Sequence, residues 1–119
     1  MADPTGRLSD EQLELMLRNM PIGLSVADET DVVLFWAGAG FDTCHLKFIG
    51  RDLRDCHPKR AHTALEALLA DLKSGAKDEV NTVEHGPHGS ERIIYTALRD
   101  EKGVYHGVLE TVVPLTDGR

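Results

Sequence analysis

The sequence has few aromatic residues and a minority of positive charges. Its 119 residues include three Phe, two Tyr and one Trp, too few for the row of rings on which single-stranded nucleic acids stack. Thirteen Lys and Arg stand against twenty Asp and Glu, a formal net charge of −7, which disfavours attraction to phosphate backbones and anionic lipids. We therefore expect neither nucleic acid nor a membrane among the partners.

Cysteines and long apolar runs are scarce too. Two cysteines do not make a disulfide framework, so we expect reduced thiols and a cytoplasmic protein. No apolar run reaches the roughly 20 residues of a membrane span, and no signal peptide is recognisable. The length suits one domain with its own core, and we expect it to span 1–119, with a frayed segment at 1–7, a helix at 8–20 and a core at 21–117.

The periodicity of the apolar residues predicts two helices. Ser9 and Gln12 have the spacing of a capping box before the first one, and Pro21 ends it. A longer helix is expected from about residue 59 to 74, because Pro58 suits its first turn and Gly75 stops it. The first helix carries an apolar stripe that must pack on another surface, formed by Leu13, Met16, Leu17 and Met20.

Alternating apolar residues and turn signals predict five strands. A hairpin is expected from residue 22 to 36, around the turn residues 28–31, and three more strands at about 79–84, 91–99 and 104–115. The connectors at 85–89 and 100–103 are short, so these three strands should form an antiparallel meander. The fold class is therefore α+β, a five-stranded antiparallel sheet with helices on one face and an N-terminal capping helix. The segment 37–50 should hold loop and short helical turns.

The order of these elements, with three motifs, resembles a PAS domain. The motifs are MPIGLSVAD at 20–28, IGRDL at 49–53 and RDEKGVYHGVLE at 99–110. A narrower resemblance, in GRDLRDCHPK at 50–59 and LKSG at 72–75, is to the PAS subgroup found beside hemerythrin-like and DUF438 domains. The resemblance implies a sensory or signalling module rather than an enzyme, whose sheet and long helix enclose a pocket for haem, flavin, a small metabolite or nothing.

The cofactor stays unknown at this stage. Flavin is disfavoured, because the segment FDTCHL at 41–46 lacks the cysteine motif of flavin photosensors of this fold. Haem stays open, because PAS haem sensors place a histidine on the long helix facing the sheet, and His62 is near that position. On the helical period His62 shares a side with Leu65 and Leu69, although a histidine that caps a loop is the commoner case.

The sequence Cys56-His57-Pro58 is the first place to look for chemistry. With His62 it offers three metal donors, but a structural zinc site needs four, and Cys44-His45 would supply more only if the loop folds back. A nucleophilic Cys56 would need a base and an oxyanion hole, and no acidic third member is indicated. The plainer interpretation is that Cys56 fills the core while His57 binds backbone. We expect no metal site and no catalytic residue.

Other residues complete the candidate ligand site. Trp36 and Tyr95 could line a pocket or be plain core, and Gly107, inside a strand, marks a close approach of ligand or backbone. His85, His88 and His106 are expected at the surface. The cofactor-binding candidates are thus Trp36, Cys56, His57, His62, Tyr95 and Gly107.

Three functions remain open. The protein is a small-molecule or haem sensor, a protein-interaction PAS module with a filled core, or a thiol or metal enzyme built on Cys56 and His57. We favour a sensory module that binds a small ligand or a protein partner and passes the signal on by dimerisation or protein interaction. We expect a homodimer through Leu13, Met16, Leu17 and Met20.

Overall fold

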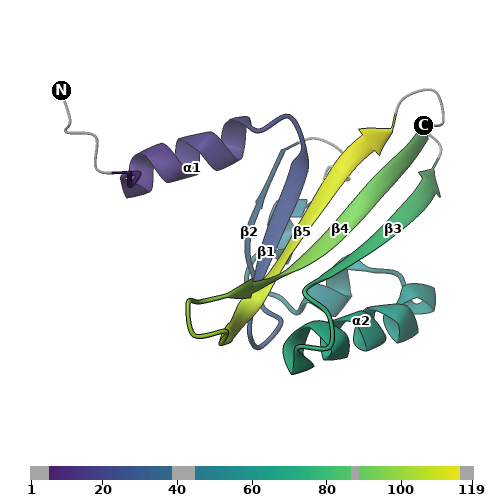
Figure 1. The fold of residues 1–119 in the computed structure, drawn as a ribbon. Helices are drawn as coiled ribbons and strands as arrows, with labels where there is room; N and C mark the ends of the chain where they lie inside the picture. Colours follow the sequence, from purple (N-terminus) through teal and green to yellow (C-terminus); the bar gives the residue numbers. More distant parts are fainter. Residues whose placement is uncertain (1–5, 39–44, 87–88, 116–119) are drawn as a thin grey trace.

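A five-stranded antiparallel sheet is the centre of the fold (Figure 1). The computed structural model describes residues 6–38, 45–86 and 89–115. The strands are β1 (Gly23–Asp28), β2 (Val33–Ala37), β3 (Glu79–Gly86), β4 (Gly89–Arg99) and β5 (Tyr105–Leu115), in the order β2-β1-β5-β4-β3. The hairpin, the meander and the α+β class expected from the sequence are confirmed. The pairing of β1 with β5 joins the hairpin to the meander in one sheet.

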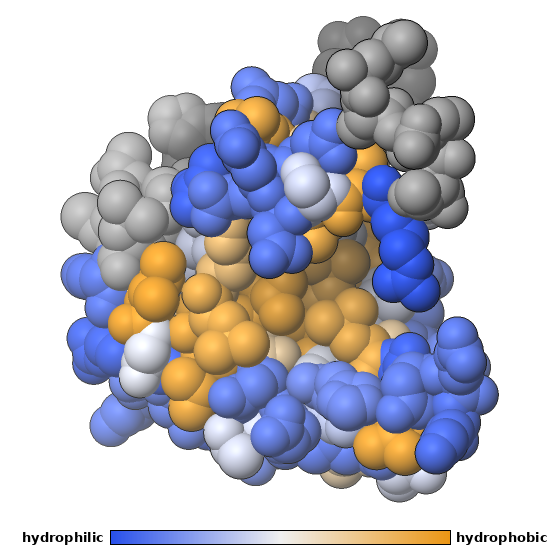
Figure 2. Space-filling model, turned by 90° about the vertical axis from the view of Figure 1, so that its left-hand side faces the viewer, coloured by the Kyte–Doolittle hydropathy of each residue, from blue (hydrophilic) through white to orange (hydrophobic). Residues whose placement is uncertain are grey.

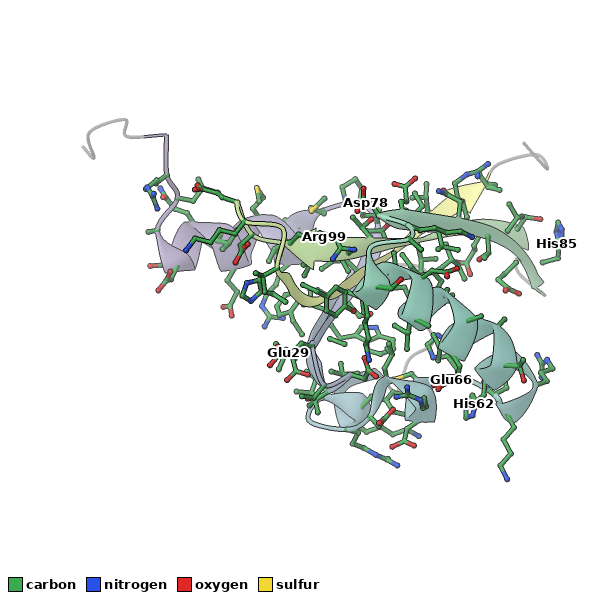
Figure 3. All side chains as sticks on the ribbon, turned by 60° about the horizontal axis from the view of Figure 1, so that its bottom comes forward. Glu29, His62, Glu66, Asp78, His85 and Arg99 are labelled. Atoms are coloured by element: carbon green, nitrogen blue, oxygen red, sulfur yellow. The ribbon has the colours of Figure 1, made fainter. Side chains whose placement is uncertain are left out.

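The long helix α2 (His62–Ser74) packs on one face of this sheet (Figure 3). Its buried side chains, Leu65, Leu68, Leu69 and Leu72, join the inward-facing residues of the strands in one core cluster. Gly75 ends the helix in the left-handed conformation, φ 87°, as the sequence predicts. Residues 59–61 form a 3₁₀ turn, η3 (Lys59–Ala61), so the α-helix begins three residues later than expected.

Two more 3₁₀ turns lie between β2 and α2. They are η1 (His45–Phe48) and η2 (Leu53–Cys56). The first lies in the segment 37–50 where short helical turns were expected, and the second follows that segment. Asp52 caps η2 by accepting a hydrogen bond from the Arg54 N–H. Leu53 is buried in the core, which fixes the turn against the rest of the domain and sets the direction of the chain at Cys56 and His57.

A buried carboxylate joins η2 and α2 to the turn between β1 and β2. The Asp31 side chain is 6% exposed and lies 3.1 Å from Arg54 Nη1 and 2.8 Å from Lys73 Nζ. Arg54 also contacts Asp52 and Glu66. A buried charge is stable only when paired, so the turn, η2 and the end of α2 are held together at this point.

The N-terminal helix α1 (Asp10–Asn19) projects away from the sheet (Figure 1). Its capping box is present, with Ser9 and Gln12 each accepting a hydrogen bond from the other's backbone N–H. None of its residues is buried, and Leu13 and Met16 are exposed. Leu17 borders a small hollow with Phe35 of β2. The apolar stripe is therefore left largely open to solvent.

The side of the molecule from which α1 projects is apolar and hollowed. Figure 2 shows a continuous hydrophobic surface there, bordered by hydrophilic side chains. The described helices include none long and apolar enough to cross a membrane.

Candidate functional site

A cavity of about 680 Å³ lies between the sheet and the helices. Its volume is in the range of small-molecule binding sites. The wall includes large apolar side chains from the sheet, η1 and α2, namely Trp36, Phe48, Leu65, Leu68, Ile93 and Val112. The rings of Trp36 and Phe48 stack with centroids 5.9 Å apart.

One rung of the sheet carries the centre of the site. Glu110 of β5 pairs with Ser25 of β1 on one side and with Tyr95 of β4 on the other, and Ser25 pairs in turn with Trp36 of β2. Residues paired across strands point to the same face, which here is the face covered by α2. Trp36, Tyr95 and Glu110 all line the cavity.

His57 reaches this rung from the end of η2. Its Nδ1 lies 3.0 Å from the carbonyl oxygen of Leu53, and because a carbonyl can only accept, Nδ1 carries the proton. Burial lowers the pKa of His57, so the ring is neutral at pH 7 and Nε2 is an acceptor. The Tyr95 hydroxyl, 3.3 Å away, therefore donates its proton to His57 Nε2.

Glu110 is a buried acidic residue in the wall of the cavity. Its side chain is 7% exposed, and Oε1 lies 3.8 Å from Nε2 of the neutral His57 ring. Within the described part of the chain, no hydrogen bond reaches the carboxylate, and burial alone raises its pKa to about 7. A buried acceptor without a donor costs free energy. Binding a proton or a hydrogen-bond donor at Glu110 would therefore be favourable.

Cys56 lines the cavity beside His57 but is unsuited to nucleophilic chemistry. Burial, together with the charge of Glu110, raises the pKa of its thiol to about 12. The thiolate is the reactive form of cysteine, and almost none is present at neutral pH. Among the described residues, His, Cys, Asp and Glu side chains form no group of three that could hold a metal ion. Cys44 lies outside the described residues.

The structure places His62 away from the cavity. Its Nε2 lies 2.9 Å from the carbonyl oxygen of Arg54 and 3.0 Å from that of His57, so it donates to the end of η2 and is not part of the cavity wall. Figure 3 shows His62 at the start of α2. The helical period suggested an inward ring, but the carbonyls of the preceding turn hold it instead.

Gly107 is likewise separate from the cavity. A Cβ atom built on it would lie 2.1 Å from the carbonyl oxygen of Ala27, and its φ is +147°. The close approach that the sequence suggested is therefore one of backbone to backbone, where β5 passes β1. Four of the six expected cofactor-binding residues, Trp36, Cys56, His57 and Tyr95, do share the cavity.

Glu110 was missed by the sequence analysis, although a signal for it was present. In β5 it stands between Val108 and Val112, and all three are buried. In a strand, alternate residues point to one face, so a glutamate in the apolar register is an exception that calls for a partner. A strand-by-strand reading of the two faces would have identified it.

The residues present fit haem poorly. Haem iron needs an axial ligand, but His62 is engaged with two carbonyls and His57 Nε2 accepts from Tyr95. Three carboxylates, Glu84, Glu91 and Glu110, line the cavity and would repel the two propionates of the porphyrin. No bond to iron is inferred for this chain.

Comparison with known proteins agrees with this architecture. A family model described as a PAS domain matches residues 13–116. The chain is similar to a C-terminal domain from Streptococcus mutans, with 25% identity and a TM-score of 0.81 over 98% of this chain and 92% of that one. No curated protein matches the sequence.

Two further structures, both from Vibrio, share the fold at lower identity. A sensory box sensor histidine kinase from Vibrio cholerae has 12% identity and a TM-score of 0.60, over 87% of this chain and 89% of that one. A complex of VqmA with ligand and DNA, from the same genus, has 20% identity and a TM-score of 0.58, over 94% of this chain but only 53% of that one.

Proposed function

The chain belongs to the PAS domain family, and we propose that it is a sensory module that binds a small ligand in the cavity beneath its sheet. The observation that carries this proposal is the cavity of about 680 Å³ whose wall holds a buried carboxylate without a hydrogen bond from the described residues. A protein-interaction module with a filled core would have neither. The raised pKa of Cys56 argues against a thiol enzyme. Sensor proteins with this fold, such as the histidine kinase above, support the sensory role.

A ligand screen with two matched tryptophan variants tests the proposal. Ala64 lines the cavity, whereas Ala67, also exposed on α2, does not. A small-molecule library is screened by the rise in melting temperature, because a ligand that binds only the native state stabilises it. Hits should be lost in Ala64→Trp and kept in Ala67→Trp. Hits that survive in both variants would place binding elsewhere and contradict the proposal.

Haem loading is checked by an absorption spectrum of protein purified from haem-supplemented cells. We expect no Soret band. A Soret band that disappears in His57→Ala, with His62→Ala as the comparison, would overturn this expectation and make haem the ligand.

We further propose that the module signals as a dimer of two copies that meet through α1. The apolar stripe of α1 is exposed, and the surrounding surface is hollowed and hydrophobic (Figure 2). Light scattering after size exclusion should give a dimer for the wild type and a monomer for Met16→Glu. Val83→Glu, an equally exposed position on β3, should stay dimeric. A dimeric Met16→Glu protein would reject this interface.

The expectation that no nucleic acid is bound stays a prediction based on charge. VqmA binds DNA, but this chain matches only about half of the VqmA chain. The DNA contacts of that protein therefore do not transfer to this one.

A further inference from the structure

The charge of the cavity wall specifies the class of ligand, if the cavity is the ligand site proposed above. We propose that the cavity selects a ligand that carries a protonated amine, which pairs with Glu110, on an apolar or aromatic body, which packs against Trp36, Phe48 and Leu68. Three features of the cavity favour such a ligand: the missing donor at Glu110, the charge of the sheet wall, and the apolar remainder of the cavity.

The hydrogen bonds around Glu110 do not supply its carboxylate with a donor. Leu53 takes the Nδ1 proton of His57, and His57 Nε2 takes the hydroxyl proton of Tyr95. The protons of His57 and Tyr95 are therefore engaged elsewhere. The hydroxyl of Ser25, the neighbour of Glu110 across the strand pair, makes no hydrogen bond within the described residues, so it does not satisfy the carboxylate either. An ammonium group on a ligand supplies both the protons and the opposite charge.

The part of the sheet that lines the cavity carries three acidic side chains. Glu84 of β3 and Glu91 of β4 are directly paired, and both line the cavity together with Glu110. Like charges placed opposite each other across two strands destabilise a sheet. A cationic ligand relieves this repulsion, whereas an anionic one adds to it. The two cations of the wall, Lys47 and Arg60, lie on η1 and η3, on the opposite side from the sheet.

The apolar part of the cavity wall indicates what the rest of the ligand must be. Apolar side chains from the sheet and the helices line the cavity, and two of them are the stacked rings of Trp36 and Phe48. Aromatic faces attract cations and pack well against other rings. A bare metal ion or a fully polar amine would leave this surface without a partner, so the amine must carry an apolar portion.

The test compares three probes that share one ring: 2-phenylethylamine, which is a cation at pH 7.5, 2-phenylethanol, which is neutral, and phenylacetate, which is an anion. Affinities are measured by NMR titration of the full chain. The amine should bind at least tenfold more tightly than the alcohol, and the anion least. Glu110→Gln should weaken the amine at least tenfold and leave the alcohol unchanged, while Glu101→Gln, on the exposed hairpin, should change neither.

The wild-type protein provides a second test that does not depend on a variant. Glu110 is faced by Ser25, Tyr95, His57 and Cys56. Burial lowers the pKa of His57 below its ordinary value, and burial raises the pKa values of Tyr95 and Cys56. Because the pKa of Glu110 is raised to about 7, affinity for the amine should rise roughly tenfold from pH 6 to pH 8 as the carboxylate forms. The affinity for the alcohol should not.

The outcomes separate this inference from the function on which it rests. If the alcohol binds in the cavity as tightly as the amine, the charge selection is wrong and a ligand site remains. If Glu110→Gln weakens both probes equally, the same conclusion holds. If no probe binds and the library screen gives no hit that Ala64→Trp removes, both proposals fail.

Discussion

The ionisation of Glu110 should make the stability of the domain fall as the pH rises. The pKa of this carboxyl is raised from 4.5 to about 7 by burial, so the native state holds a proton that the unfolded state has lost. The stabilisation is fully present below pH 4.5 and is lost as the pH rises to about 7. A shift of roughly two and a half units corresponds to about 3 kcal/mol of unfolding free energy.

Glu110→Gln removes this dependence while keeping the shape of the side chain. Urea unfolding at pH 5, 6, 7 and 8 should show the variant increasingly more stable than the wild type, by up to about 3 kcal/mol at pH 8. Glu101→Gln corrects for the general effect of removing one negative charge from an acidic protein. Parallel pH profiles of wild type and Glu110→Gln would refute the reasoning, because the carboxyl would then ionise equally in both states.

Three further predictions concern the rest of the framework. Asp31→Asn removes the buried charge that holds Arg54 and Lys73 and should cost about 1 to 3 kcal/mol in urea unfolding. Asp78→Asn, whose side chain is 87% exposed in its ion pair with Arg99 (Figure 3), should cost less than about 0.5 kcal/mol. Equal losses would contradict the role of Asp31. Gly107→Ala should destabilise the domain far more than Gly50→Ala, since only at Gly107 does a Cβ meet backbone; similar melting temperatures would reject the close approach. In peptide mapping after iodoacetamide treatment at pH 8, Cys56 should react at least about a hundredfold more slowly in the native than in the unfolded protein, because its pKa is raised to about 12; rapid native labelling would show an accessible thiolate.

Local signals predicted most of the fold. The capping box at Ser9, the stop at Gly75 and the turn after β4 depend on neighbouring residues, and the structure has each of them. The pairing of β1 with β5 joins residues about 85 positions apart and has no local signature. The sequence alone could therefore name the strands but not complete their order.

The candidate site was harder to predict than the fold, for two physical reasons. His62 lies on the helical face that points inward, but the carbonyls of Arg54 and His57 hold its ring, and their position depends on how η2 folds. Glu110 takes its properties from residues on three strands and from His57. A residue whose role depends on several distant partners shows itself in the sequence only as an exception to the apolar alternation.

The location of a bound ligand tests the central claim, that the cavity beneath the sheet is the sensory site, most directly. Methyl NMR of the protein, titrated with 2-phenylethylamine, should show saturable shifts at Leu65, Leu68 and Val112, which line the cavity, and these shifts should vanish in Ala64→Trp. Shifts confined to the methyl groups of α1, such as those of Leu13, or shifts that persist unchanged in Ala64→Trp, would contradict the account.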